Sequence, residues 1–166
     1  SVYTKPVYIF DKDIGDLHAQ IHSVLVNSAA ESRSDAFAKY FKEAVSKADI
    51  LVYLGHSGLG GNLDIPTLEE RVGKFKFKKD KSQIFYFDSC SSYSYYLESF
   101  LQRKDGKNID ILSYGLESYF DTSNAILQVF LETFLNPEQK MSWAQILEKM
   151  QEPLGDRTFL LSVGGN

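Results

Sequence analysis

The sequence predicts an α/β fold, a three-layer α/β/α sandwich whose sheet is mostly parallel. Short runs of branched and aromatic residues recur along the chain and are typical of strands buried on both faces. Stretches with apolar residues at helical spacing lie between these runs, and such alternation favours a sheet covered by helices on both sides. With 166 residues, the chain is predicted to form one domain, 1–166.

The first predicted elements are a strand over residues 7–10 and a polar turn over 11–16. The turn contains three aspartates, but it departs from the EF-hand calcium loop because glycine stands at the fifth place and no glutamate closes it. His18 and His22 would share one face of a helix, whereas a strand over 21–26 would put them on different local structures. No third metal ligand stands at suitable spacing, so we expect two surface or partly buried histidines.

Residues 34–48 form the clearest predicted helix, for which Ser32 and Ser34 are candidate N-caps. Its apolar stripe consists of Phe37, Tyr40, Phe41, Ala44, Val45 and Ala48. A strand over 50–54 follows, and then a loop marked by Gly60, Gly61 and Pro66.

Lysines alternate with Phe75 and Phe77 in residues 74–81. This pattern raises the question of a nucleic-acid-binding strip. The net charge of −4 and the absence of a nucleic-acid-binding motif argue against it. We therefore expect an edge strand or loop with its lysines in water and both phenylalanines packed inward.

The second half of the chain continues the alternation. After a strand over 84–87, a helix is predicted with Tyr96, Leu97, Phe100 and Leu101 as its apolar face. The elements that follow are a polar basic loop over 102–108, a strand over 109–114, a helix over 123–135, a helix with a Ser142–Gln145 capping box and a buried stripe of Trp143, Ile146, Leu147 and Met150, and a strand over 158–163.

Composition limits the function classes further. No apolar run is long enough to span a membrane, so we do not expect a membrane as a partner. The net charge of −4 likewise gives no reason to expect a nucleic acid. The single cysteine excludes an internal disulfide framework and predicts nothing about the compartment. Because the chain begins at Ser1 without a methionine, we expect a processed or excised piece of a longer precursor, whose other segments are candidate partners.

Two predicted strands end in chemically capable side chains. The strand over 50–54 continues as Gly55-His56-Ser57-Gly58, and the strand over 84–87 as Asp88-Ser89-Cys90. If the two strands are neighbours, their C-terminal loops share the edge of the sheet where open α/β folds build their sites. A thiol with an imidazole partner is suited to nucleophilic catalysis.

Ser57 offers a competing hydrolase. Gly55-His56-Ser57-Gly58 is close to the nucleophile elbow of α/β-hydrolases, although Leu59 stands where the second glycine belongs. That family places its histidine after the serine, and no histidine follows His56 in this chain. We therefore rank a Ser57 hydrolase well below a Cys90 enzyme.

An apolar strand ending in Gly-His and a second ending in Asp-Ser-Cys resemble the caspase-like cysteine peptidases, the group of caspases, metacaspases, clostripain, gingipains, legumain and separase. The resemblance implies Cys90 as the nucleophile, His56 as the proton-transfer residue and the Cys90 amide as an oxyanion donor. A glycine after the histidine usually supplies a second donor. Here Ser57 precedes Gly58, which leaves that donor open between the two.

The resemblance also bears on specificity. In metacaspase- and clostripain-like members, an aspartate at the position of Asp88 lines the pocket for the residue before the scissile bond. A carboxylate there would bind Arg or Lys through a charge-assisted hydrogen bond. The structural alternative for Asp88 is to cap the helix that begins near Ser91.

The sequence thus predicts a cysteine endopeptidase that needs no metal or organic cofactor and acts on a peptide or protein. Self-cleavage is a further hypothesis, with Arg103, Lys104 and Lys107 as candidate sites. Taken singly, Cys90 could be a small buried hydrophobe and His56 an ordinary structural histidine. The alternative function is therefore a non-catalytic caspase-like binding or regulatory module.

Overall fold

The structure is a computed structural model that describes residues 7–26, 35–58, 63–157 and 160–163, the last of these by backbone alone. The chain divides into two compact units. The first contains α2 to β5 together with β6, and the second contains the β1–β2 hairpin, α5, α6 and the 3₁₀ turn η1. Each unit is described by itself.

A four-stranded sheet forms the centre of the first unit, in the order β3-β4-β5-β6. Its strands are β3 (Ile50–Leu54), β4 (Gln83–Asp88), β5 (Ile109–Tyr114) and β6 (Leu160–Val163). The first three are mutually parallel, and β6 runs antiparallel to β5. The predictions of an α/β class and of a mostly parallel sheet are therefore confirmed.

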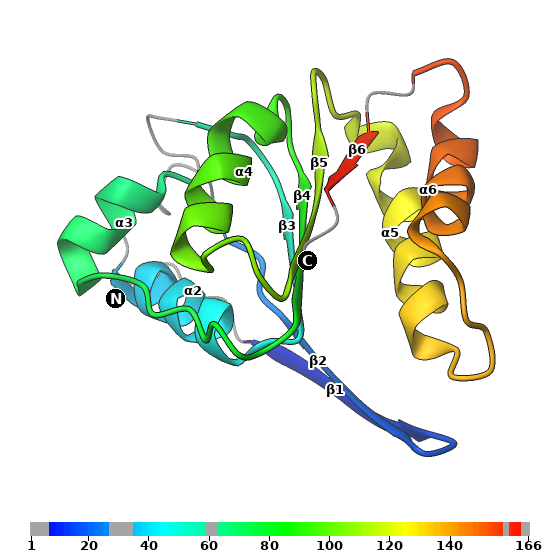
Figure 1. Ribbon diagram of the computed structural model, residues 1–166, viewed down its shortest axis with the longest axis horizontal. Helices are drawn as coiled ribbons and strands as arrows, with labels where there is room; N and C mark the ends of the chain where they lie inside the picture. Colours follow the sequence, from blue (N-terminus) through cyan, green and yellow to red (C-terminus); the bar gives the residue numbers. More distant parts are fainter. Residues whose placement is uncertain (1–6, 27–34, 59–62, 158–159, 164–166) are drawn as a thin grey trace. The chain divides into compact units, whose positions relative to one another are not determined.

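Three helices cover one face of this sheet (Figure 1). They are α2 (Asp35–Lys47), α3 (Ile65–Val72) and α4 (Ser92–Arg103). Alternate residues of β4, Phe85 and Phe87, are completely buried against Phe100 of α4, with ring centroids 5.0 Å apart in both pairs. The aromatic residues that predict the strand thus form the core between the sheet and the helices.

The helix predicted over 34–48 is confirmed as α2, while its candidate caps Ser32 and Ser34 lie outside the described residues. The prediction of a loop at Pro66 is wrong, because Pro66 lies in the first turn of α3. Asp64 caps that helix: its carboxylate accepts hydrogen bonds from the Thr67 amide and hydroxyl. Proline is tolerated in a first helical turn, where its missing N–H has no partner to lose.

The lysine-rich segment after α3 is a loop in which Phe75 is 6% exposed and Phe77 is half-buried, while Lys76 and Lys78 are exposed. This confirms the inward packing of the two phenylalanines. The prediction of a polar loop over 102–108 is wrong for its first residues. Gln102 and Arg103 end α4, and Lys104 is completely buried.

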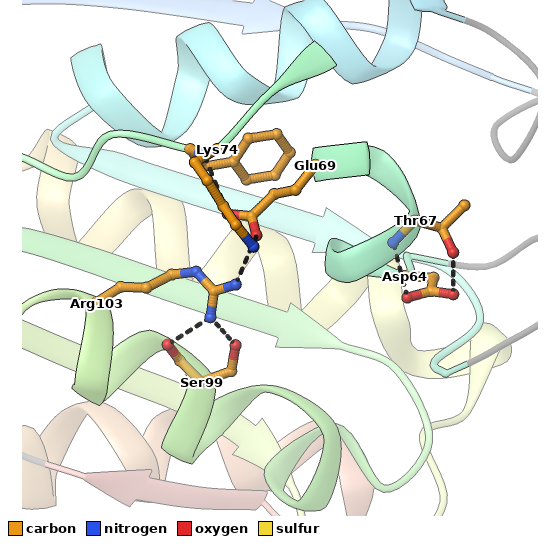
Figure 2. A network of polar contacts seen from close by, with 7 residues as sticks. Asp64, Thr67, Glu69, Lys74, Ser99 and Arg103 are labelled. Carbon is orange, nitrogen blue, oxygen red and sulfur yellow. Dashed lines mark hydrogen bonds and ion pairs between the residues drawn. The ribbon is translucent and has the colours of Figure 1, made fainter. Parts of the chain in front are cut away.

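A buried carboxylate joins α3 to α4 (Figure 2). Glu69 is 4% exposed, and its Oε2 lies 2.8 Å from Lys74 Nζ and 3.1 Å from Arg103 Nη2. Its other oxygen accepts the Phe75 amide at 3.0 Å, and Arg103 also donates to Ser99. Burial raises the pKa of Glu69, but these cations and the Phe75 amide outweigh it and lower the pKa overall.

The second unit corrects the prediction for the N-terminal segment. β1 (Tyr8–Ile14) pairs antiparallel with β2 (Leu17–Ser23), so residues 11–14 belong to a strand and only Gly15 and Asp16 turn. His18 and His22 lie on the same strand, so the helical alternative is wrong. The strand expected over 21–26 starts earlier and ends at Ser23.

The remaining elements of this unit are α5 (Phe120–Leu135), α6 (Trp143–Gln151) and η1 (Glu152–Leu154). α5 begins three residues before its predicted start. The Ser142–Gln145 capping box of α6 is confirmed, and Ile146 and Met150 of its stripe are buried. No helix in the described part of the chain is long and apolar enough to cross a membrane.

Candidate active site

The histidine and the cysteine follow two neighbouring parallel strands. Leu54 of β3 is the register partner of Asp88 of β4, and the next amide, that of Gly55, donates to the Asp88 carbonyl at 3.1 Å. His56 and Cys90 each lie two residues beyond this register pair. Since neighbouring strands are about 4.8 Å apart, both loops leave the sheet from one short stretch of its edge.

Cys90 lies in a sharp strand-to-helix turn. The thiol is exposed, and the next residue, Ser91, adopts a left-handed backbone with φ of 51° before α4 begins at Ser92. A non-glycine residue in this region is uncommon and marks a constrained turn. The turn presents the thiol at the surface and places it at the start of a helix.

The end of β5 and the loop after it hold this turn in place. The Ser91 amide donates to the Leu116 carbonyl, and the Tyr114 amide donates to Ser92 Oγ at 2.9 Å. Ser92 Oγ in turn donates to the Phe87 carbonyl at 2.9 Å. The sequence alone did not reveal Ser92, because a serine after a strand gives no signal of a buried bridge to another strand.

The thiol itself faces the same loop. Cys90 Sγ lies 3.9 Å from the Ser118 carbonyl oxygen and 3.8 Å from Ser118 Oγ, both within reach of a weak sulfur hydrogen bond. The Cys90 amide donates to no other described residue. It therefore remains available as an oxyanion donor beside the thiol.

The backbone of the histidine loop is anchored from β3. Tyr53, which is 8% exposed, donates its hydroxyl to the His56 carbonyl at 2.8 Å. The side chain of His56 is exposed, as Cys90 is. Gly55 gives the hydroxyl its room, because a Cβ there would lie 2.8 Å from Tyr53 Oη.

The two candidates for the second oxyanion donor differ in their surroundings. The Gly58 amide is buried and donates to Tyr96 Oη at 3.3 Å, so it points into the protein. The backbone of Ser57 forms an isolated parallel bridge with Leu63, so neither amide is singled out as the second donor. The Ser57 hydroxyl is also buried and faces Tyr96, which weighs against Ser57 as an exposed nucleophile.

Asp88 is 1% exposed and lies near the hydroxyls of Tyr86 and Tyr114, which are also buried. Burial, and after it the charge of Asp88, raises the pKa of both tyrosines, so both stay neutral. The N-cap position of α4 belongs to Ser91 and not to Asp88, which argues against the helix-capping alternative for Asp88.

No group of three or more histidine, cysteine, aspartate or glutamate side chains in the described ranges is arranged to hold a metal ion. His18 has carboxylate neighbours on the hairpin: Asp13 Oδ1 at 2.7 Å and Asp11 Oδ1 at 3.5 Å. The hydrogen bond to Asp13, with the charge of Asp11, raises the pKa of His18.

Comparisons with known proteins identify no family for this chain. The chain matches no family model, no curated protein and no solved structure. The arrangement of the candidate site therefore stands on the residues of this chain alone.

Proposed function

We propose that the chain is a cysteine endopeptidase with a caspase-like, three-layer α/β/α fold, in which Cys90 is the nucleophile and His56 the proton-transfer residue. The carrying observation is the register of β3 and β4, from which both side chains emerge two residues past one backbone pair. Exposure of both side chains suits them to act on a peptide or protein.

The chemistry requires a proton to leave the thiol and later to reach the leaving amine. His56 accepts the Cys90 proton as sulfur attacks the carbonyl carbon, and a tetrahedral intermediate forms. His56 then protonates the amine as the carbon–nitrogen bond breaks, leaving an acyl-enzyme. Water, deprotonated by His56, attacks the thioester; the carbon–sulfur bond breaks as His56 returns that proton to sulfur, and the carboxylic acid product loses its own proton to solvent.

The Cys90 amide, together with the amide of Ser57 or Gly58, forms the proposed oxyanion hole. The Cys90 amide is adjacent to the attacking sulfur, as such a donor must be. Gly58 could contribute only by giving up its bond to Tyr96. Loss of one donor of this kind typically costs about a hundredfold to a thousandfold in rate, so the identity of the second donor bears directly on efficiency.

Cleavage after Arg or Lys is the proposed specificity, with Asp88 as the carboxylate that binds the substrate cation. Because Asp88 is 1% exposed, a substrate side chain would have to uncover it. The neutral hydroxyls of Tyr86 and Tyr114 lie beside that carboxylate and would line the floor of such a pocket.

Of the three candidate sites for self-cleavage between α4 and β5, one is accessible. Arg103 is engaged by Glu69 and Ser99, and Lys104 is completely buried. Lys107 is exposed and is the candidate that a peptidase could reach. A cut there would yield processed segments of the same precursor.

The test is hydrolysis of fluorogenic peptides ending in Arg, Lys, Asp or Leu by wild type, Cys90→Ala and a matched control, Ser94→Ala, in an exposed serine of α4. Cleavage after Arg or Lys that disappears only in Cys90→Ala supports the peptidase and the Asp88 pocket. Cys90-dependent cleavage after another residue keeps the peptidase and rejects the pocket. Turnover that is absent, or that survives in Cys90→Ala, rejects the peptidase and leaves the non-catalytic module.

A further inference from the structure

Tyr96 connects the helix of the nucleophile to the loop of the histidine. It belongs to α4, which begins at the Cys90 turn, and it is 2% exposed. Its ring packs against Phe87 of β4 with centroids 4.6 Å apart. The ring is therefore fixed between strand and helix, and its hydroxyl has a defined position.

That hydroxyl bonds to Gly58, two residues after His56, and to Leu63. It accepts a hydrogen bond from the Gly58 amide at 3.3 Å and donates one to the Leu63 carbonyl at 2.9 Å. Burial raises the pKa of Tyr96 to about 12, while the Gly58 amide and the Ser57 hydroxyl oppose the rise. A neutral phenol is the form that donates and accepts at once.

Gly58 is shaped for this contact. Its φ is +87°, and a Cβ there would lie 2.8 Å from the ring of Tyr95. The loop can thus approach α4 closely only with glycine at this position. Gly58 is two residues from His56, whose carbonyl is held by Tyr53 on the other side.

We infer that Tyr96 is a positioning residue of the proposed peptidase, which sets the His56 loop at its working distance from Cys90 through Gly58 and Leu63. This role rests on the proposed function. One rigid helix would carry both the turn that presents the thiol and the hydroxyl that fixes the histidine loop. A displacement of about 1 Å in a reacting group can cost about a hundredfold in rate.

The test compares Tyr96→Phe with the matched control Tyr95→Phe, which removes the same atom from the adjacent, half-exposed side chain. Both variants keep their rings. We expect Tyr96→Phe to lower kcat by about 10- to 100-fold with KM within about twofold, and Tyr95→Phe to leave both unchanged. Hydrogen exchange of the Gly58 amide, followed by NMR, should accelerate at least about tenfold in Tyr96→Phe alone.

Two outcomes separate this role from the proposed function. Wild type without Cys90-dependent turnover overturns the proposed function and the role of Tyr96 with it. Cys90-dependent turnover with equal kcat in wild type and Tyr96→Phe overturns only the role of Tyr96, even if Gly58 exchange accelerates.

A second variant covers the case in which Tyr96→Phe fails to fold. Gly58→Ala meets the Tyr95 ring and moves the same loop while leaving the Tyr96 hydroxyl in place. A comparable loss of kcat with unchanged KM supports positioning of the loop. Wild-type kcat in folded Gly58→Ala overturns it.

Discussion

The two edges of the β3–β4–β5 sheet treat polar groups in opposite ways. At the C-terminal edge, His56 and Cys90 are exposed while hydrogen bonds fix the backbone around them. At the N-terminal edge, Lys104 is completely buried and its ammonium donates to the carbonyls of Lys78 and Lys81 and to Gln83 Oε1.

Gln83, which accepts from Lys104, also closes the N-terminal edge. Gln83, 2% exposed, donates its amide to the carbonyls of Val45 and Ala48 at 3.1 and 2.8 Å, so the end of α2 is tied to β4. All three donors of the Lys104 ammonium are used, which is what a buried cation requires. A buried polar group with all its hydrogen bonds made thus indicates a role in stability, whereas an exposed side chain on a fixed backbone indicates a place for chemistry.

The largest effect expected from this comparison is that of His56→Ala. Loss of the proton-transfer group should lower kcat by about a thousandfold, while the free energy of unfolding changes by no more than about 0.5 kcal/mol, because the side chain is exposed. Peptide turnover and urea unfolding measure the two quantities. The matched control is His22→Ala in an exposed hairpin histidine, and equal loss of turnover in both variants would contradict the assignment.

Lys104→Met should have the opposite profile. Three acceptors lose their donor in a buried site, so we expect the free energy of unfolding to fall by about 3 kcal/mol. Turnover per folded molecule should stay within about twofold, because the edge lies across the sheet from Cys90. Lys107→Met is the matched control, since Lys107 is exposed. Equal stability of the two variants would show that burial of the ammonium contributes nothing.

Glu69→Gln tests a second buried polar group through the pH dependence of stability. The folded pKa of Glu69 is lowered from its ordinary value of 4.5, so its ionised form stabilises the fold above about pH 4.5, and this contribution is lost as pH falls through the folded pKa. We expect a loss of about 2 kcal/mol at pH 7.

The loss should be smaller at pH 3 than at pH 7, because the stabilising contribution of the charge decreases as pH falls below 4.5 toward the lowered folded pKa. Urea unfolding at the two pH values measures it, with the exposed Glu70→Gln as control. A loss that is the same at both pH values would show that the charge of Glu69 is not its cause.

The C-terminal edge was the more predictable of the two. Strand patterns and the residues after them were enough to place His56 and Cys90 at neighbouring strand ends, because parallel strands bring their carboxyl ends to one edge. The sequence also placed α2, β3, β4 and β5. Such inferences rest on local periodicity, which tertiary contacts here reinforce.

The features that sequence reasoning missed depend on distant partners. The sequence predicts a polar basic loop at Lys104, because its acceptors lie 21 to 26 residues earlier in the chain and leave no local signal. The first strand was expected to end before Asp11, yet β2 supplies partners that extend it to Ile14. Tyr96 was assigned to an apolar face, since its hydroxyl bonds to Gly58 and Leu63 exist only after folding.

Tyr53→Phe should give the smallest effect, at the boundary between the two kinds of polar group. Tyr53 is buried like Gln83, but its hydroxyl holds the carbonyl of His56. Removing one neutral hydrogen bond should lower the free energy of unfolding by about 1 kcal/mol. Because Tyr96 still holds the loop two residues further on, kcat should fall by only about three- to tenfold.

Tyr93→Phe, in a tyrosine that is 40% exposed, is the matched control, measured by urea unfolding and peptide turnover. If Tyr53→Phe lowers stability and leaves kcat unchanged, its hydroxyl belongs with the structural groups of the N-terminal edge. If kcat falls as well, the His56 loop is held from both sides. The double variant Tyr53→Phe/Tyr96→Phe should then lower kcat by more than the product of the two single effects, because neither anchor remains.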